Sequence, residues 1–320
     1  MSGALIIVCI RNSIWSANVC ERDVAMGYLI LITSYFLYGL SDAAGPLAFR
    51  LGSDSTTLAL LNCVIPLPFI AGTLVATRQS FRIGLRPLVA ASALGLCAGL
   101  TALTLNGSYV LIGAGIGTVL HMSHSVVASF GEAALERRPP RIGTLLALAL
   151  ALSGIGIFSL TGERTTASIF GVALALFSGV TYGAVTLLAG HSAVKNVATF
   201  QAQFYSFLFA SATLCVYCLT TRGYLLPTLG AKAWSIHVFC AVLTNYAAFA
   251  LVCYGIRRAG STIGSIMGAL EPVFCALFSV ILLGERFTVA NVLGGFLILL
   301  GVIVEPLWKA KQDSACAMKS

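Results

Sequence analysis

Four ionisable side chains stand inside long apolar stretches of the chain and are the residues best suited to chemistry. Asp42 and Glu271 carry carboxyl groups, and His121 and His124 are three residues apart, on one face of a helix. An ionisable group in an apolar environment is costly unless it is paired or hydrated, so it marks a candidate functional site. We expect these four residues to bind a solute. Glu271, Asp42 and His124 are the candidates for proton coupling, because carboxyl and imidazole groups exchange protons readily.

Each acid also has a purely structural interpretation. Pro46 follows Asp42 by four residues, so an alternative role for Asp42 is to cap a broken helix end near the membrane surface. Pro272 directly follows Glu271 and removes a helical hydrogen bond, which kinks a helix and frees carbonyl groups. Glu271 would then form a fixed hydrogen bond to a neighbouring helix. Pro46 and Pro272 are accordingly predicted to be kink or hinge positions.

The two histidines have three interpretations. In the first they line a cavity or handle protons, and in the second they are neutral hydrogen-bonding groups in the core. The third is a metal site, but two ligands without a third make a poor one. The sequence therefore predicts neither a metal nor a cofactor.

Uncharged polar residues complete the predicted binding site. Tyr38 and Tyr182 can stack on a solute or hydrogen-bond it, although a Tyr-Gly pair also suits close helix packing. Asn245 lies in the middle of an apolar stretch, and Asn62 offers a further amide. Gln203 stands near the start of an apolar stretch and is assigned to the membrane interface.

Composition excludes a water-soluble protein. The chain of 320 residues is 58% hydrophobic and 9% charged, with a mean hydropathy of +0.95, whereas soluble domains carry about a quarter charged residues. Apolar runs long enough to cross about 30 Å of hydrocarbon recur throughout. They predict an all-α membrane protein with ten transmembrane helices: 26–49, 56–77, 87–106, 110–131, 142–160, 168–189, 199–219, 233–256, 262–283 and 288–308.

The basic residues predict the orientation. With both termini in the cytoplasm, most of the 19 Lys and Arg residues fall on the cytoplasmic side, as the positive-inside rule requires. The other side then holds Arg50, Arg164, Arg222, Lys232 and Arg286. The net charge of +8 thus reflects topology rather than nucleic-acid binding. We expect a multi-pass protein of the plasma membrane, which in a bacterium is the inner membrane.

Two stretches 144 residues apart repeat the same pattern. Gly27, Ser34 and Tyr38-Gly39 in the first match Gly171, Ser178 and Tyr182-Gly183 in the second. The match continues into the next spans, so chance recurrence is a poor explanation. Five spans in each copy is an odd number, which predicts two inverted repeats, 26–160 and 161–308. Residues 1–25 and 309–320 are the expected cytoplasmic tails. Met26 opens the first span, so an over-extended start is an alternative for 1–25.

The end of the chain carries a family signature. Leu270-Glu271-Pro272-Val273 is followed by Leu283-Gly284-Glu285-Arg286-Phe287-Thr288 and by Gly294-Gly295 and Gly301. This series resembles the closing signature of EamA-type proteins of the drug/metabolite transporter superfamily. The resemblance implies ten helices, a central cavity and export of small metabolites or amino acids. Glu285 is interpreted as a loop cap or ion-pair partner of Arg286.

Together these features predict a secondary transporter working by alternating access, coupled to protons in one variant of the hypothesis. No Walker motif for ATP, protease motif or ion-channel filter is present in the sequence, so an enzyme is not expected. The expected partners are a small solute, protons and lipid. Two alternatives remain open: a non-transporting membrane partner or sensor, and a metal-dependent enzyme centred on His121 and His124.

Overall fold

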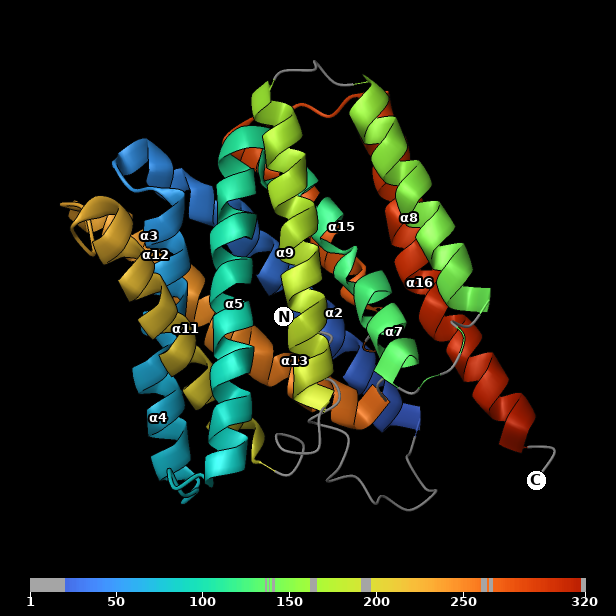
Figure 1. The fold of residues 1–320 in the computed structure, drawn as a ribbon, viewed down its shortest axis with the longest axis horizontal. Coiled ribbons are helices and arrows are strands. Elements are labelled where there is room, and N and C mark those ends of the chain that lie inside the picture. Colours follow the sequence, from blue (N-terminus) through green and yellow to red (C-terminus); the bar gives the residue numbers. More distant parts are fainter. Residues whose placement is uncertain are drawn as a thin grey trace.

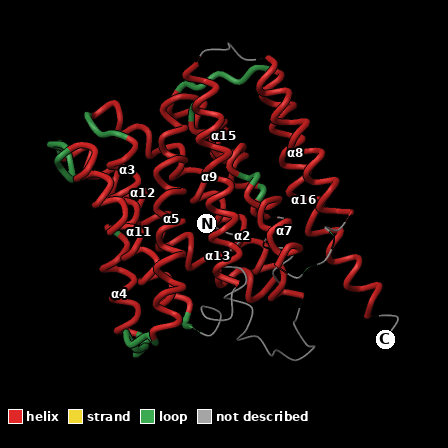
Figure 2. The backbone as a smooth tube through the Cα atoms, viewed as in Figure 1, coloured by secondary structure: helices red, strands yellow, loops and turns green. Residues whose placement is uncertain are grey.

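The structure, a computed structural model, consists of helices joined by short loops. It describes residues 21–135, 137, 139, 142–161, 166–190, 197–259, 264 and 267–317. This part of the chain contains no strand, as Figures 1 and 2 show. Most of residues 1–25 lie outside the described part, so the predicted N-terminal tail is not placed.

The helices follow the predicted apolar runs, some of them in two or three pieces. In chain order they are α2 (Glu21–Ala44), η2 (Gly45–Leu51), α3 (Ser55–Val64), α4 (Pro66–Ala76), α5 (Leu85–Ile112), α6 (Ala114–His121), α7 (His124–Leu135), α8 (Ile142–Thr161), α9 (Thr166–Gly190), α11 (Thr199–Arg222), α12 (Ala231–Val242), η3 (Leu243–Ala248), α13 (Phe249–Ala259), α15 (Leu270–Phe278), η4 (Ser279–Leu283) and α16 (Val289–Ala317). η2 is a 3-10 helix, and η3 and η4 are π-helices.

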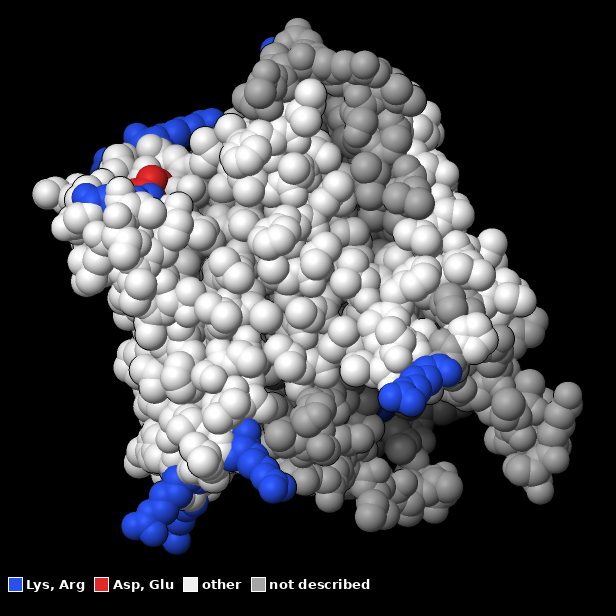
Figure 3. Space-filling view, viewed as in Figure 1, with Lys and Arg blue, Asp and Glu red and all other residues white. Residues whose placement is uncertain are grey.

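The outer surface suits lipid. Large apolar side chains are well exposed, among them Leu29, Val75, Val216 and Phe296 at 61 to 67%. On the face shown in Figure 3, the basic side chains of the described residues gather towards the edges and leave a wide uncharged band between them. Exposed apolar area of this extent, bordered by charge, is typical of a membrane protein.

Among the described residues, five helices are long and apolar enough to cross a membrane on their own. They are Ser55–Ala76, Leu85–Ile112, Ile169–Leu188, Thr199–Arg222 and Ala231–Ile256, with the shorter apolar helices Leu270–Leu283 and Val289–Val304 beside them. The all-helical membrane fold is thus confirmed. The count of ten spans and the cytoplasmic termini stay predictions.

The two predicted proline positions stand at helix beginnings. α2 ends at Ala44, and Pro46 is the second residue of the 3-10 helix η2. The N–H groups of a helix's first turn have no partner within the helix, so a proline is tolerated there. Pro272 lies in the first turn of α15, after a turn at Ala269. The interruption of this span therefore lies three residues before Pro272 rather than at it.

The span that precedes α8 is also interrupted, although it contains no proline. α6 ends at His121 and α7 begins at His124. The Met122 N–H is shared between the carbonyl groups three and four residues back at 3.2 and 3.3 Å, and the Ser123 N–H donates three residues back at 3.1 Å. Such tightened hydrogen bonds break the α-helical ladder. The break lies against Gly179 of α9, where an added Cβ would come within 2.3 Å of the Ser123 Oγ.

The first helix of each predicted repeat packs mainly into the opposite repeat. α2 packs against α13, η3 and α15, whereas α9 packs against α5, α6 and α7. The repeat-related glycines make these contacts possible. Gly39 lies against the backbone of Glu271 and Cys275, and Gly183 lies against Val127 and the His124 carbonyl. Small residues at such places allow helices to approach closely within a membrane. α8 and α16 form a separate pair along one edge of the molecule (Figure 1).

A pair of loop contacts joins distant elements at one end of the bundle. The Asp54 carboxylate caps α3 by accepting from the Thr57 N–H at 2.9 Å, and the Arg222 guanidinium of α11 donates to both carboxylate oxygens. Burial alone would raise the pKa of Asp54, but the hydrogen bonds from Arg222 and Thr57 outweigh burial and hold this pKa below its ordinary value. Asp54 is therefore ionised at neutral pH.

Glu285 has the capping role expected for it. Its Oε1 accepts from the Ala114 N–H at 2.7 Å and its Oε2 from the Gly115 N–H at 3.3 Å, so the carboxylate caps the N-terminus of α6. A negative charge is favourable there because the helix dipole is positive at that end.

The helix ends differ in places from the predicted spans. α5 runs six residues beyond 106 to Ile112, because Tyr109 and its neighbours continue the buried face of this helix. α16 continues to Ala317, where the expected C-terminal tail begins at 309. Neither glycine nor proline occurs between Lys309 and Ala317 to stop it. The boundary between the two repeats stays a prediction.

Candidate functional site

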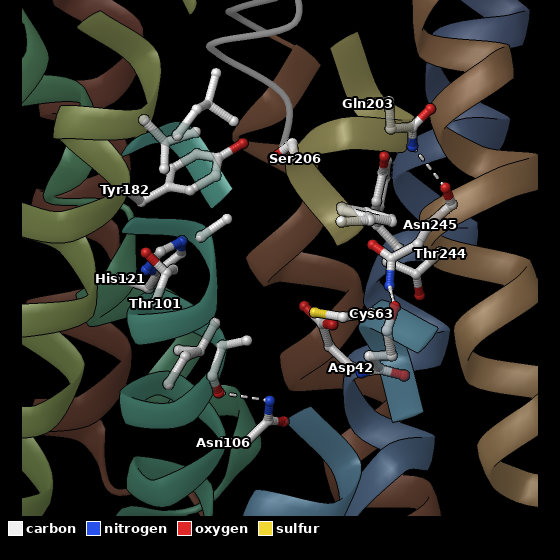
Figure 4. Close-up of a pocket in the computed structure, with 18 of the residues that line it drawn as sticks. Asp42, Cys63, Thr101, Asn106, His121, Tyr182, Gln203, Ser206, Thr244 and Asn245 are labelled. Atoms are coloured by element: carbon white, nitrogen blue, oxygen red, sulfur yellow. Dashed lines mark hydrogen bonds between the residues drawn. The ribbon is translucent and has the colours of Figure 1, made fainter. Parts of the chain in front are cut away.

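A central cavity of about 150 Å³ lies between α2, α3, α5, α6, α9, α11, η3 and α15. Figure 4 shows its two walls, with Tyr182, His121, Thr101 and Asn106 on one side and Gln203, Thr244, Asn245 and Asp42 on the other. Cavities of this size hold about one six-membered ring. The helices that pack across the two predicted repeats thus enclose a space large enough for a small solute.

Six of the seven predicted binding residues line this cavity: Tyr38, Asp42, His121, Tyr182, Asn245 and Glu271. The seventh, His124, is buried behind them. The His124 ring centroid lies 4.7 Å from that of Tyr182 and 5.2 Å from that of His121. The structure therefore brings together residues that are up to 233 positions apart in the sequence, and His124 reaches the cavity only through its neighbours.

The polar lining residues that were not predicted include Thr101, Gln203, Ser206 and Thr244. Gln203 was assigned to the membrane interface, but its side chain is 3% exposed and lines the cavity. That assignment was wrong because proximity to a span's end was taken as exposure. The spacing of Gln203 and Ser206, three residues apart on one face of α11, is the signal that identifies them.

Three amide side chains are oriented by backbone carbonyl groups. Asn245 Nδ2 donates to the Asn62 carbonyl at 2.8 Å, Gln203 Nε2 to the Asn245 carbonyl at 2.8 Å, and Asn106 Nδ2 to the Ala102 carbonyl at 2.7 Å (Figure 4). A carbonyl oxygen can only accept, so the NH₂ group of each amide must face it. One N–H of each amide is thereby engaged, and the amide oxygen and the second N–H are left for other partners.

The hydrogen bonds of Ser178 determine the tautomer of His121. Ser178 Oγ donates its single proton to the Ala175 carbonyl at 2.6 Å. The His121 Nδ1, 2.9 Å from the same oxygen, must then be the donor. Neutral His121 therefore carries its proton on Nδ1 and a free lone pair on Nε2. This arrangement leaves Nε2 able to accept a proton or a hydrogen bond.

Four buried polar atoms on the cavity wall have no hydrogen-bond partner in the structure. They are Asn62 Oδ1, Tyr182 Oη, Gln203 Oε1 and Glu271 Oε2. Buried polar groups are nearly always satisfied by protein or water, because an unsatisfied one costs about 1–3 kcal/mol. Their convergence on one cavity indicates that a polar ligand or water completes them.

A π-helical segment carries part of the wall. In η3, Thr244 and Asn245 face the cavity, and side chains of other helices donate to two carbonyl groups of this segment. Gln203 donates to Asn245, and Ser34 of α2 donates to the Ala248 carbonyl at 2.8 Å. π-helical turns inside α-helices are frequent at functional sites. Within the described residues, no three His, Cys, Asp or Glu side chains are close enough to hold a metal ion.

Known proteins resemble this chain in sequence and in fold. Residues 169–304 match the EamA-like transporter family. An uncharacterized transporter of Archaeoglobus fulgidus is 28% identical over 163 residues, which cover 51% of this chain and 56% of that protein. The uncharacterized transporter YwfM of Bacillus subtilis is 24% identical over 213 residues, 63% of this chain and 68% of that protein. The chain thus aligns with little more than half of its archaeal relative.

One solved crystal structure has the same fold, with a TM-score of 0.56 and 14% sequence identity over 91% of this chain and 99% of that structure. The likeness in fold extends over both predicted repeats, whereas the family match covers the second. The second half of this chain thus resembles the EamA-like transporter family, and the relatives named transporters together with the apolar helices support a multi-pass membrane protein.

Proposed function

We propose that the protein is a secondary transporter that moves a small polar metabolite, such as an amino acid or a related amine, out of the cell by alternating access. The observation that carries this proposal is the central cavity, where four unsatisfied polar atoms from separate helices meet. Polar side chains that served only to hold helices together would form hydrogen bonds with one another. Unpaired groups around a shared space instead favour a ligand that comes and goes.

The helix packing supports the mechanism. α2 packs into the second predicted repeat and α9 into the first, in corresponding ways. An exchange of this kind is expected of inverted repeats, whose two equivalent arrangements open the cavity to opposite sides of the membrane. We propose ten spans with both termini in the cytoplasm on this basis and on the distribution of basic residues.

Proton coupling follows from the two carboxyl groups. Asp42 of α2 and Glu271 of α15 both line the cavity, on helices that pack together. Each group can carry either a proton or a bond to the solute. Binding of a solute donor at Glu271 then displaces a proton, and return of the proton releases the solute. His121, with its free Nε2, and His124 behind it stand on the opposite wall as further proton acceptors.

Reconstitution tests this proposal directly. Purified protein in liposomes is given a mixture of radiolabelled amino acids and amines, with and without a pH gradient, and uptake is measured. We expect flux that the gradient accelerates, and a Glu271→Gln variant whose residual flux no longer responds to the gradient. Ser211→Ala is the matched control, because the Ser211 Oγ is also buried and unpartnered but does not line the cavity.

The contrary results are equally clear. Absence of flux for every solute, from protein that elutes as a single folded species, would favour the alternative class of a non-transporting membrane partner or sensor. A gradient response that survives in Glu271→Gln removes the coupling role from Glu271. The shared cavity favours the transporter, since a sensor or assembly partner has no need of a space between its helices.

A further inference from the structure

Several acceptor oxygens on the cavity wall have no partner among the described residues. Asp42 and Glu271 contribute carboxyl oxygens, and the unpartnered Glu271 Oε2 is buried with its side chain 5% exposed. Asn62 Oδ1 and Gln203 Oε1 are unpartnered as well. Acceptors gathered in this way require a ligand that brings N–H or O–H donors.

Several of the donors that the wall might offer are already used. The side-chain nitrogens of Asn106, Gln203 and Asn245 each donate to a backbone carbonyl group. His121 donates its Nδ1 proton to Ser178. A carboxylate entering the cavity would meet hydroxyl groups such as that of Tyr182. Among the described lining residues it would find neither lysine nor arginine.

The rest of the wall is apolar and suits an organic group. Leu94, Leu105, Val185 and Phe207 line the cavity between the polar clusters. Tyr38 and Tyr182 add aromatic rings that a cation can approach. A space of about 150 Å³ is far larger than a bare metal ion. The ligand therefore combines a donor-bearing cationic end with a compact apolar body.

We propose that the cavity selects a small organic monocation with an ammonium group and discriminates against the same molecule bearing a carboxylate. This inference rests on the proposed transport function and narrows its substrate class from amino acids and amines to amines. The ammonium group binds at Glu271 and Asp42, with the oxygens of Asn62 and Gln203 as further acceptors. The apolar body lies among the leucine and tyrosine side chains.

Binding to the purified full-length protein in lipid nanodiscs tests the inference without requiring transport. The probes share one ring and differ in one group: benzylamine, benzyl alcohol and phenylglycine, which is benzylamine with an added carboxylate. Calorimetric titration is run for each probe, and again with benzylamine in high sodium chloride. We expect benzylamine to bind at least about tenfold more tightly than either other probe, equivalent to about 1.4 kcal/mol.

Two variants test whether benzylamine binds through the acceptor groups of Glu271 and Asn62. Glu271→Gln and Asn62→Leu should each weaken benzylamine binding, by about tenfold or more for the first, because each removes an acceptor that the ammonium group uses. Two variants are used so that a folding failure of one leaves the other to decide. Ser211→Ala should bind benzylamine as the unchanged protein does, since its hydroxyl group is buried elsewhere.

Several results overturn the inference. The inference is wrong if phenylglycine binds as tightly as benzylamine, or if benzylamine does not bind at concentrations up to about 10 mM. It is also wrong if both variants bind benzylamine with unchanged affinity. Displacement of benzylamine by sodium ions as efficiently as by another amine would contradict it as well. Failure of the transport proposal has a different signature. Benzylamine would then bind with the expected selectivity, while liposomes containing the protein showed no flux of it.

Discussion

The Nδ1 atom of His121 in α6 lies 2.9 Å from the Oγ of Ser178 in α9, and this contact joins the two predicted repeats at the cavity wall. In Ser178→Ala the imidazole N–H loses its acceptor within the protein. We expect a loss of about 1–3 kcal/mol in the free energy of unfolding, and slower solute flux, because a buried donor is left unsatisfied. Thermal unfolding in detergent and flux in liposomes measure the two effects.

Ser34→Ala provides the comparison for Ser178. Ser34 is the equivalent residue of the first predicted repeat, and its hydroxyl donates only to the Ala248 carbonyl. The loss expected there is about 0.5–1.5 kcal/mol, the usual net value of one hydrogen bond. An equal effect of the two substitutions would show that the His121 contact adds nothing.

The ion pair between Asp54 and Arg222 should make a small contribution that can be separated from helix capping. Asp54→Asn keeps a good capping residue and removes the charge, so we expect it to lower stability by about 0.2–1 kcal/mol. Asp54→Ala removes the cap of α3 as well and should cost about 1 kcal/mol more. Unfolding of the three proteins is compared by tryptophan fluorescence. Equal losses in both variants would assign the whole effect to the charge.

The same pair predicts a pH dependence. The folded state lowers the pKa of Asp54, so the carboxylate stabilises the fold above the unfolded-state pKa of about 3.9, and this stabilisation is lost as the pH falls through the lower folded-state value. The difference in melting temperature between the unchanged protein and Asp54→Asn should stay constant above about pH 5 and shrink below about pH 4. A difference that grows with falling pH contradicts this prediction.

Glycine substitutions should separate helix packing from helix propensity. An added Cβ at Gly39 would lie 2.6 Å from the Cys275 backbone nitrogen, whereas at Gly183 it would meet the movable Val127 side chain at 2.7 Å. We expect Gly39→Ala to cost about 1–3 kcal/mol and Gly183→Ala less. Gly72→Ala, with no heavy atom within 4 Å, should stabilise α4 by up to about 1 kcal/mol. A reversed order in thermal unfolding would contradict this reading of the packing.

The cap of α6 should depend on the carboxylate of Glu285. Glu285→Gln retains one acceptor for the Ala114 and Gly115 N–H groups but loses the charge, so we expect an intermediate loss. Glu285→Ala should cost about 0.5–2 kcal/mol. Hydrogen exchange of residues 114–121 provides a local measurement, because loss of the cap frays the first turn. Unchanged exchange in Glu285→Ala would mean that neighbouring groups replace the cap.

The repeat pattern made much of the site predictable. Tyr38 and Tyr182 occupy equivalent positions, and each line of reasoning that placed one in the cavity also placed the other. Asp42, His121 and Glu271 were identifiable because a polar group in an apolar span is costly without a purpose. The free-energy cost of burying a polar side chain depends mainly on that residue's own type, so candidate site residues of this kind can be recognised in the sequence.

The misses arose where the geometry of the chain departs from a uniform helix. Thr244 was missed because it lies in a π-helical segment, and the altered helical phase of this segment is not visible in the sequence. The turn at Ala269 lies within the turn that Pro272 would disrupt, but a second interruption occurs at Met122 without any proline to predict it. Gln203 is buried by neighbouring helices whose positions are unknown until the fold is known.

The cap that Glu285 forms on α6 connects this helix to α15 and η4, so these three elements should move together. Glu285, just after η4, holds the beginning of α6, and Gly115 of α6 lies against Ala276 and Ser279 of α15 and η4. His121 at the other end of α6 is thereby tied to a loop of the opposite half of the chain. In the proposed alternating access, α6 would therefore move together with α15 and η4, and each moving unit would combine helices of both predicted repeats.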